Sequence, residues 1–511
     1  MKINTVIDNT RARMMDLPYL TKRFLRDSWV GYLFTRAPNP RDTLVFAKYW
    51  IMNWAAIIYW IAEAIVKLGP IGFARALYHN PWILILLRVN GVANRLSRGG
   101  RTGVYHDSIC LVVHTICLGV IDQLRQMLFD PERLVIFEDL VPYDIGRAMG
   151  LQCYLLELMG IVLPIMYTEA SLQYIDEAEN SGMNPDACSL PKATVGMVLK
   201  GHMPKGVAMV SSNMPCDAGA ASYAFIQRAY NIPTYRVDAP YNFYNERAEK
   251  LFAKDVMGMI AWLEEHTPGR MDWDKMREIC EGRNRMVELE NELFDMIRVR
   301  PAPVACEAVW LSHIWHFNVT AGYPRSVKLY EKLIKMARGN LEHKISAAKK
   351  EKYRAVLWNP PFLHFSDIFN WAESTYGVVL INDSMTYNHH GPIDTSSRET
   401  MIRDWGRTIM QGPMVRHTRG PAENYLDDIF RMVEQFDLDM VWVANHVGCK
   451  GGQAMNGILR EQCRAKGVPL LILDYDLSDP RIVSHDNMMR QVEFFMENVM
   501  KAKRLDQQGA A

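Results

Sequence analysis

The sequence predicts an α/β protein with two parallel-sheet domains, a helical region that joins them and an additional helical N-terminal extension. Residues 440–480 read as strand, loop, helix and strand, and the loop carries Cys449. Residues 207–240 repeat this layout with Cys216 at the equivalent place. An earlier βαβ-like unit precedes each of these two, in the same order, so we expect two related sheets that face each other.

The chain of 511 residues is long enough for several domains with buried cores. We assign residues 1–130 to the helical N-terminal extension and 131–245 to the first α/β domain. Residues 246–350 interleave charged with apolar residues at helical spacing and form a helical connector or lid, and 351–511 form the second α/β domain.

The extension contains the most apolar stretch, 14 residues without a charge from Tyr49 to Ala62. A helix needs about 20 apolar residues to span a membrane. We therefore interpret this stretch as a buried or subunit-interface helix, with a membrane-surface helix and a membrane span as the alternatives.

Both α/β domains show strand signals separated by helical ones. In the first domain, strands are expected at RLVIFED and QCYLLEL, a helix near Cys188, a strand at 207–210 and a helix at 218–230. In the second, YRAVLWN and GVVLIND are strands that flank a helix with Ser366 as a possible N-cap. The insert 385–425 is a candidate substrate loop because of its length.

Composition narrows the function classes. The formal net charge is +1 and Lys/Arg-rich runs are missing from the sequence, so we expect no nucleic-acid partner, and a membrane is not expected as one. Nine widely spread cysteines without a CxxC pair argue against a disulfide framework or a zinc ribbon. The N-terminus lacks a signal-peptide pattern, which favours a reducing cytoplasm.

Three cysteines lie where chemistry is expected. Cys188, Cys216 and Cys449 each come just before a predicted helix, where free amides and the helix dipole favour a thiolate. Spacing alone leaves three interpretations open: a [4Fe-4S] cluster with one open iron, unrelated buried cysteines, or a cysteine nucleophile. The other six are interpreted as core residues: Cys110, Cys117, Cys153, Cys280, Cys306 and Cys463.

At these cysteines the chain resembles the iron–sulfur catalytic subunits of the 2-hydroxyacyl-CoA dehydratase and ATP-dependent (class I) benzoyl-CoA reductase family. The resemblance runs from about Arg133 to Met500. It rests on DACSLPKATVGM, on SSNMPCDAG followed by IPTYRVDAPYN, and on NHVGCKGGQAM followed by DYDLSDPR. The N-terminal 130 residues match nothing in the family, and 139–148 lacks the Ser/Glu-type pocket residues of some dehydratases.

This resemblance implies two flavodoxin-like halves and a [4Fe-4S] cluster on Cys188, Cys216 and Cys449. It also implies an acyl-CoA substrate, a homologous second subunit in a heterodimer, and a separate homodimeric [4Fe-4S] ATPase that uses ATP to inject an electron. The chain has no GxxxxGK[ST] loop, which is consistent with ATP acting only through that activator.

The resemblance favours reduction of an aromatic acyl-CoA, because the YRAVLWNPP and DLSDPRIVSHDN segments are similar to reductase subunits. A 2-hydroxyacyl-CoA dehydratase and a non-catalytic electron-relay subunit remain alternatives. His446, three residues before Cys449, and His364, in the NPPFLHF loop, are the candidate proton donors, and His389, His390 and His485 are more remote.

Overall fold

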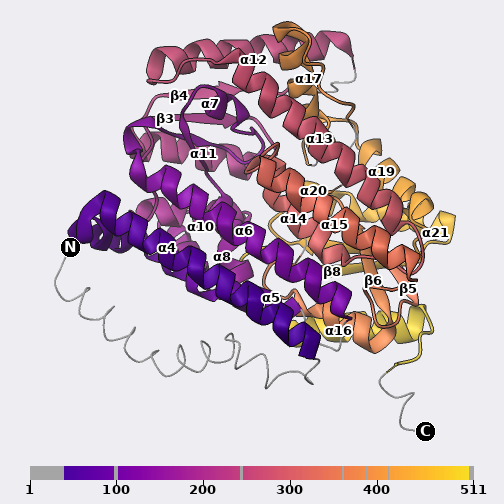
Figure 1. Ribbon diagram of the computed structural model, residues 1–511. Coiled ribbons are helices and arrows are strands. Elements are labelled where there is room, and N and C mark those ends of the chain that lie inside the picture. Colours follow the sequence, from indigo (N-terminus) through magenta and orange to yellow (C-terminus); the bar gives the residue numbers. More distant parts are fainter. Residues whose placement is uncertain are drawn as a thin grey trace.

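The computed structural model describes residues 40–96, 102–241, 245–359, 362–386, 390–412 and 414–505. Its centre is formed by two separate four-stranded sheets, both fully parallel, with helices around them (Figure 1). The predicted α/β class with two sheets and a helical N-terminal region is confirmed.

The two sheets have the same strand order. The first is β2-β1-β3-β4 and the second is β6-β5-β7-β8. This order corresponds to the first four strands of the flavodoxin-like arrangement 2-1-3-4-5. The strand bounds are β1 Leu134–Phe137, β2 Gln152–Leu155, β3 Ala208–Ser212, β4 Thr234–Val237, β5 Tyr353–Trp358, β6 Val378–Asp383, β7 Met440–His446 and β8 Leu470–Tyr475.

The central strands are buried along their whole length, because helices cover both faces of each sheet. The helices of the extension and the first domain are α4 Pro40–His79, η1 Pro81–Arg88, α5 Val89–Leu96, α6 Gly103–Phe129, η2 Pro131–Arg133, α7 Asp144–Ala148, α8 Leu158–Met166, α9 Leu172–Asn180, α10 Ser189–Leu199 and α11 Asp217–Tyr230. The connector contains α12 Glu246–His266, α13 Trp273–Ile297, α14 Cys306–Asn318 and α15 Pro324–Glu342.

The second domain repeats the helix-and-strand alternation. Its helices are α16 Asp367–Tyr376, α17 Arg398–Met410, α18 Val415–Arg419, α19 Glu423–Gln435, α20 Lys450–Ala454, α21 Asn456–Lys466, α22 His485–Phe494 and the π-helical η3 Phe495–Val499. The helix expected after Cys449 is therefore split into α20 and α21. The insert 385–425 is not an open loop, because α17 and α18 occupy much of its described part.

The turns that end the helices explain why both domains fold alike. Asn231 ends α11 and Gly467 ends α21, each in the left-handed conformation with φ of 47° and 67°. An Ile-Pro or Val-Pro pair follows and starts the next strand. Local chemistry thus sets the same helix-to-strand connection twice.

Helix α4 lies along α6 at the outer edge of the molecule (Figure 1). Its inner face is buried through Phe46, Ile57 and Trp60. Its outer face is not buried, so the prediction of a core helix holds for one side only. The six cysteines interpreted as core residues are all buried, which confirms that prediction.

Candidate functional site

The candidate site lies at the carboxyl ends of the strands, where parallel sheets bind ligands next to the change in strand order. In the first sheet that change falls between β1 and β3, which are followed by Glu138 and by the loop to Cys216. In the second it falls between β5 and β7, and β7 ends at His446 and leads to Cys449. The same edge of each sheet therefore carries the candidate residues.

The three cysteines start three helices, as predicted. Cys188, Cys216 and Cys449 are the N-cap residues of α10, α11 and α20. Cys216 is exposed and the other two are half-buried, and all three thiols are free. A negative charge on Cys216 would raise the pKa of Cys188, and one on Cys449 would raise the pKa of Cys216, so the three thiols lie close enough to interact.

Gly448 brings the second domain onto the first. A Cβ on Gly448 would lie 2.6 Å from the Cα of Cys188 and 3.0 Å from its backbone nitrogen. Only glycine allows this contact between two backbones. The loop that carries Cys449 is thereby held directly against the residue that starts α10.

A second connection runs through the DLSDPR segment. The backbone N–H of Ser478 donates to the Ser189 hydroxyl at 3.0 Å, and the Ser478 hydroxyl donates to the Gly160 carbonyl at 3.0 Å. Arg481 pairs with Asp176 at 2.8 Å. The segment after β8 therefore fastens the second domain to the helix starts of the first.

The Cys216 loop is fixed by its neighbour strand. Asn213 donates its amide to the Ala239 carbonyl at 3.1 Å and accepts from the Ala239 N–H at 2.9 Å. Asn213 thus ties the loop before Cys216 to the segment after β4. This gives a physical role to the described part of the DAPYN motif, of which Asn242 lies outside the described residues.

Burial outweighs the helix dipoles at two of the thiols. Burial raises the pKa of Cys188 well above its usual range, although a hydrogen bond from the backbone amide of Leu190 lowers it. Burial likewise raises the pKa of Cys216 to about 11, although hydrogen bonds from the backbone amides of Gly219 and Ala218 lower it. In the metal-free protein both groups stay protonated at neutral pH, so a metal must displace their protons on binding.

His446 holds Cys188 through one ring nitrogen. Its Nε2 lies 3.1 Å from the Cys188 sulfur, and its Nδ1 accepts the Leu477 N–H at 3.2 Å. Because Nδ1 accepts, the ring proton resides on Nε2 and is donated to the sulfur. Burial lowers the pKa of His446, against the charge of Asp476, so the ring is neutral. We interpret His446 as a group that positions Cys188.

His364 lies at the same edge, and burial lowers its pKa to about 4 despite the nearby charge of Asp476. Its Nδ1 is buried without a hydrogen-bond partner among the described residues. His485 instead pairs with Asp367 at 3.0 Å, and His390 bonds to the Gly391 carbonyl at 3.2 Å. His389 lies outside the described residues.

Three carboxyl groups, two of them buried and one half-buried, occupy the first-sheet edge, and sequence reasoning missed them as site residues. Glu138 follows β1, Asp139 comes next, and Glu157 follows β2. Glu157 donates its N–H to Asp139 at 2.9 Å, and its charge acts on both Cys188 and Cys216. Their only sequence signal is an acidic residue just after each of two strands.

Burial favours the protonated form of these acids. It raises the pKa of Glu138 to about 8 and that of Asp139 to about 7, and it raises the pKa of Glu157 well above its usual range. One oxygen of Glu138 and one of Glu157 have no hydrogen-bond partner among the described residues. A protonated carboxyl with an unbonded oxygen is suited to donate a proton or a hydrogen bond to a substrate.

We expect Glu138→Gln to flatten the pH dependence of stability between about pH 5 and pH 8. The folded-state pKa lies above the unfolded one, so the folded state binds more protons and stability falls as pH rises through this window. Each unit of difference corresponds to about 1.4 kcal/mol. Thermal unfolding of the wild type and of Glu138→Gln at several pH values measures this difference. Parallel curves of stability against pH would contradict the raised pKa of Glu138.

Among the described residues, no group of three or more His, Cys, Asp or Glu side chains is arranged to hold a single metal ion. The three thiolates of a [4Fe-4S] ligand set bind three different irons and stand apart from one another. Three free thiols at helix starts on one edge are the donor type that such a cluster requires.

Comparison with known proteins places these features in context. A family model described as 2-hydroxyglutaryl-CoA dehydratase, D-component, matches residues 140–499. The chain is 23% identical to a benzoyl-CoA reductase subunit of Thauera aromatica over 354 residues, which cover 64% of this chain and 79% of the relative. It is 20% identical to lactoyl-CoA dehydratase subunit alpha of Anaerotignum propionicum over 365 residues, covering 64% and 82%.

A third relative matches over a shorter region. The (R)-2-hydroxyglutaryl-CoA dehydratase, subunit alpha, of Acidaminococcus fermentans is 25% identical over 163 residues, which cover 31% of this chain and 34% of the relative. The family match begins after the helical extension, and it includes Cys188, Cys216 and Cys449.

Proposed function

Because the chain belongs to the 2-hydroxyglutaryl-CoA dehydratase D-component family, we propose that it is the [4Fe-4S] subunit of an enzyme that reduces an aromatic acyl-CoA thioester. Its named relatives are subunits of benzoyl-CoA reductase and of 2-hydroxyacyl-CoA dehydratases. Over matches of similar length, the chain is 23% identical to the benzoyl-CoA reductase subunit and 20% identical to the lactoyl-CoA dehydratase subunit, which favours the reductase.

One observation carries the proposal: three free cysteines at helix starts lie at the carboxyl ends of the two sheets, near the buried acids Glu138 and Glu157 and the half-buried Asp139. Cys188, Cys216 and Cys449 would hold the cluster, which supplies a low-potential electron when bound. Reduction of an acyl-CoA also consumes protons, and a protonated carboxyl beside the cysteines can supply them. A site for electron storage alone has no use for buried acids.

The neighbouring side chains have separate roles in this proposal. Among the carboxyl groups, Glu157 has the largest electrostatic effect on the pKa of Cys188 and Cys216. We therefore assign it the role of proton donor to the substrate. His446 donates a hydrogen bond to the Cys188 sulfur, which orients that ligand and stabilises its negative charge. His364, a neutral imidazole, remains a candidate for binding the thioester carbonyl.

The partners are also proposals. The relatives are named as subunits, which supports assembly with a second, homologous subunit. The electron would come from a separate homodimeric [4Fe-4S] ATPase, and a cytoplasmic location suits this oxygen-sensitive chemistry. Elimination of water from a 2-hydroxyacyl-CoA is the second candidate reaction, and the dehydratase relatives favour it.

Anaerobic purification tests the cluster. We expect the wild type to be brown, to bind about four iron and four sulfide per chain, and to bleach in air. Cys188→Ala, Cys216→Ala and Cys449→Ala should each lose most of the iron. Cys463→Ala, at a buried cysteine of α21, is the matched control and should keep it. A folded, colourless and iron-free wild type would reject the proposal.

Activity separates the reactions. The purified subunits with the activator and ATP are assayed on an aromatic acyl-CoA and on a 2-hydroxyacyl-CoA. Turnover of the aromatic substrate supports the reductase, and turnover of the hydroxylated one the dehydratase. Turnover by this chain with the activator but without a partner subunit would reject the electron-relay alternative.

A further inference from the structure

The outer face of α4 is a continuous apolar strip. Its large residues are exposed over about six turns, from Leu44 to Val66, and the small residues between them, Ala55 and Ala62, are exposed too. The exposed fractions are Leu44 70%, Ile51 60%, Met52 37%, Ile58 60%, Tyr59 67%, Ile65 38% and Val66 83%. An exposed apolar strip of this length marks a surface that another body covers.

The inner face shows that α4 lies on the protein rather than crossing a bilayer alone. Asn53 is buried and donates to Asn90 of α5 at 2.8 Å, and His114 of α6 bonds to it at 2.7 Å. By length and apolarity both α4 and α6 could span a membrane, but 78% of the apolar window of α6 is buried, against 17% for α4. One side of α4 therefore packs against the protein, and the other is exposed and can contact a partner.

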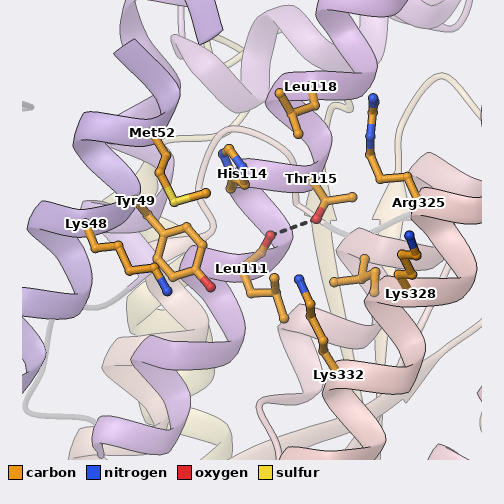
Figure 2. Close-up of a pocket in the computed structure, with 11 residues that line it drawn as sticks. Lys48, Tyr49, Met52, Leu111, His114, Thr115, Leu118, Arg325, Lys328 and Lys332 are labelled. Carbon is orange, nitrogen blue, oxygen red and sulfur yellow. Dashed lines mark hydrogen bonds between the residues drawn. The ribbon is translucent and has the colours of Figure 1, made fainter. Parts of the chain in front are cut away.

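A basic pocket borders the strip. It is a cavity of about 200 Å³ between α4, α6 and α15 (Figure 2). Its cations are Lys48 and, from α15, Arg325, Lys328 and Lys332, while Tyr49, Met52, Leu111, His114, Thr115, Leu118 and Leu329 complete the lining. Lys48 and Met52 belong to both the pocket and the exposed side of α4.

The four cations of the pocket outnumber the nearby carboxylates, although Asp107, which pairs with Arg41 at 2.7 Å, also lies within electrostatic reach of Lys48. Arg325 pairs with Asp122 at 2.6 Å, but within the described ranges no carboxylate forms an ion pair with Lys48, Lys328 or Lys332. Burial and the surrounding cations lower the pKa of His114 to about 4. A cavity with unbalanced positive charge is suited to an anionic ligand such as a phosphate.

Charge is also unevenly distributed along the sequence. Residues 1–88 contain twelve Lys/Arg and five Asp/Glu, a net charge of +7, although the whole chain carries +1. Of the two acidic residues in α4, Asp42 is buried and Glu63 pairs with Arg125 at 2.7 Å. A second copy of α4 would thus offer lysines but no free carboxylate, whereas an anionic membrane offers phosphates.

We propose that the outer face of α4 docks on an anionic membrane surface and that the adjoining pocket receives the phosphate of a lipid headgroup. The apolar strip enters the headgroup boundary, and the basic pocket stays at its edge. This inference does not depend on the reaction, and it replaces the expectation that a membrane is not a partner.

Vesicle cosedimentation of the full chain tests the proposal. We expect binding to vesicles of phosphatidylcholine with phosphatidylglycerol, weakened by salt, and little binding to phosphatidylcholine alone. Ile58→Glu should weaken binding about a hundredfold by placing a charge in the strip. Val66→Glu is a second variant if the first does not fold. Ile458→Glu, at a half-exposed isoleucine of α21, should bind as wild type.

The pocket is tested by Lys328→Gln with Lys332→Gln, which should weaken binding about thirtyfold. The control pair, Lys335→Gln with Lys349→Gln, removes the same charge from exposed sites outside the pocket and should have little effect. If both pairs of substitutions weaken binding equally, the lysines act only through their overall charge, and the proposed headgroup site is wrong. If the Lys328→Gln and Lys332→Gln pair abolishes binding of inorganic phosphate but leaves vesicle binding intact, the pocket binds a soluble anion and the headgroup site is wrong.

Two further outcomes overturn the docking face. One is a wild type that ignores anionic vesicles but is dimeric in solution, with Ile58→Glu monomeric. The other is a fall in the thermal midpoint of both Ile58→Glu and Val66→Glu, because it would show that the protein's own chain or a second subunit covers the strip.

Discussion

Gly448→Ala is expected to abolish cluster binding and turnover. The added methyl group would lie 2.6 Å from the Cα of Cys188, inside van der Waals contact with backbone that has no rotamer to change. The loop carrying Cys449 would have to move away from α10, which separates two of the three thiols. Overpacking of this kind costs about 1–3 kcal/mol. Iron content, activity and the thermal midpoint, measured anaerobically, all report the change.

Gly451→Ala is the matched control. Gly451 lies three residues further on in α20, and a Cβ there meets nothing within 4 Å. Alanine also favours a helix over glycine by about 1 kcal/mol. This variant should therefore keep its iron and be at least as stable as the wild type. If Gly448→Ala also retains iron and activity, the contact between the two loops does not set the cysteine geometry.

Glu157→Gln should lower turnover by about 10²–10⁴-fold while leaving the iron content unchanged. Glutamine has nearly the same shape and can still donate a hydrogen bond, but it cannot transfer a proton. An ionised Glu157 would raise the pKa of Cys188 and Cys216, so the carboxyl is close to where electrons would reach a substrate. A pH profile of turnover, measured beside the iron content, separates the loss of a proton donor from the loss of the cluster.

Glu177→Gln is the control for this substitution. Glu177 is partly exposed on α9 and pairs with Lys200 at 3.1 Å, a surface pair of little energetic value. Its turnover should equal that of the wild type. Wild-type turnover in Glu157→Gln would reject Glu157 as the donor and would direct attention to Asp139 or His364.

The positions of the cysteines could be predicted from the sequence because they depend on local order. Cys216 and Cys449 follow a strand and precede a helix, and parallel strands bring such residues to one edge. The duplicated helix endings at Asn231 and Gly467 fix the same connection in both domains. The order of strands, cysteines and helices along the sequence was therefore enough to predict the two-sheet fold and the positions of Cys216 and Cys449 at helix starts.

The carboxyl groups could not be identified in the same way, because their role depends on burial. Glu138 and Glu157 resemble ordinary acidic residues at strand ends, and only their burial in the folded protein raises the pKa of each carboxyl. The exposure of α4 was likewise hidden. A sequence with apolar residues on all sides of a helix does not say which side the protein covers.

The two sheets share one strand order, but they do not present the same groups at their edges. After the first central strand stands Glu138, a buried acid, and at the equivalent place after β5 stands Asn359, a neutral amide beside the Cys449 sulfur. A molecule held between the domains therefore meets a carboxyl group at the end of one central strand and an amide at the end of the other. The internal duplication thus built two edges that share a strand order but differ in chemistry, so the two orientations of a bound molecule are not equivalent.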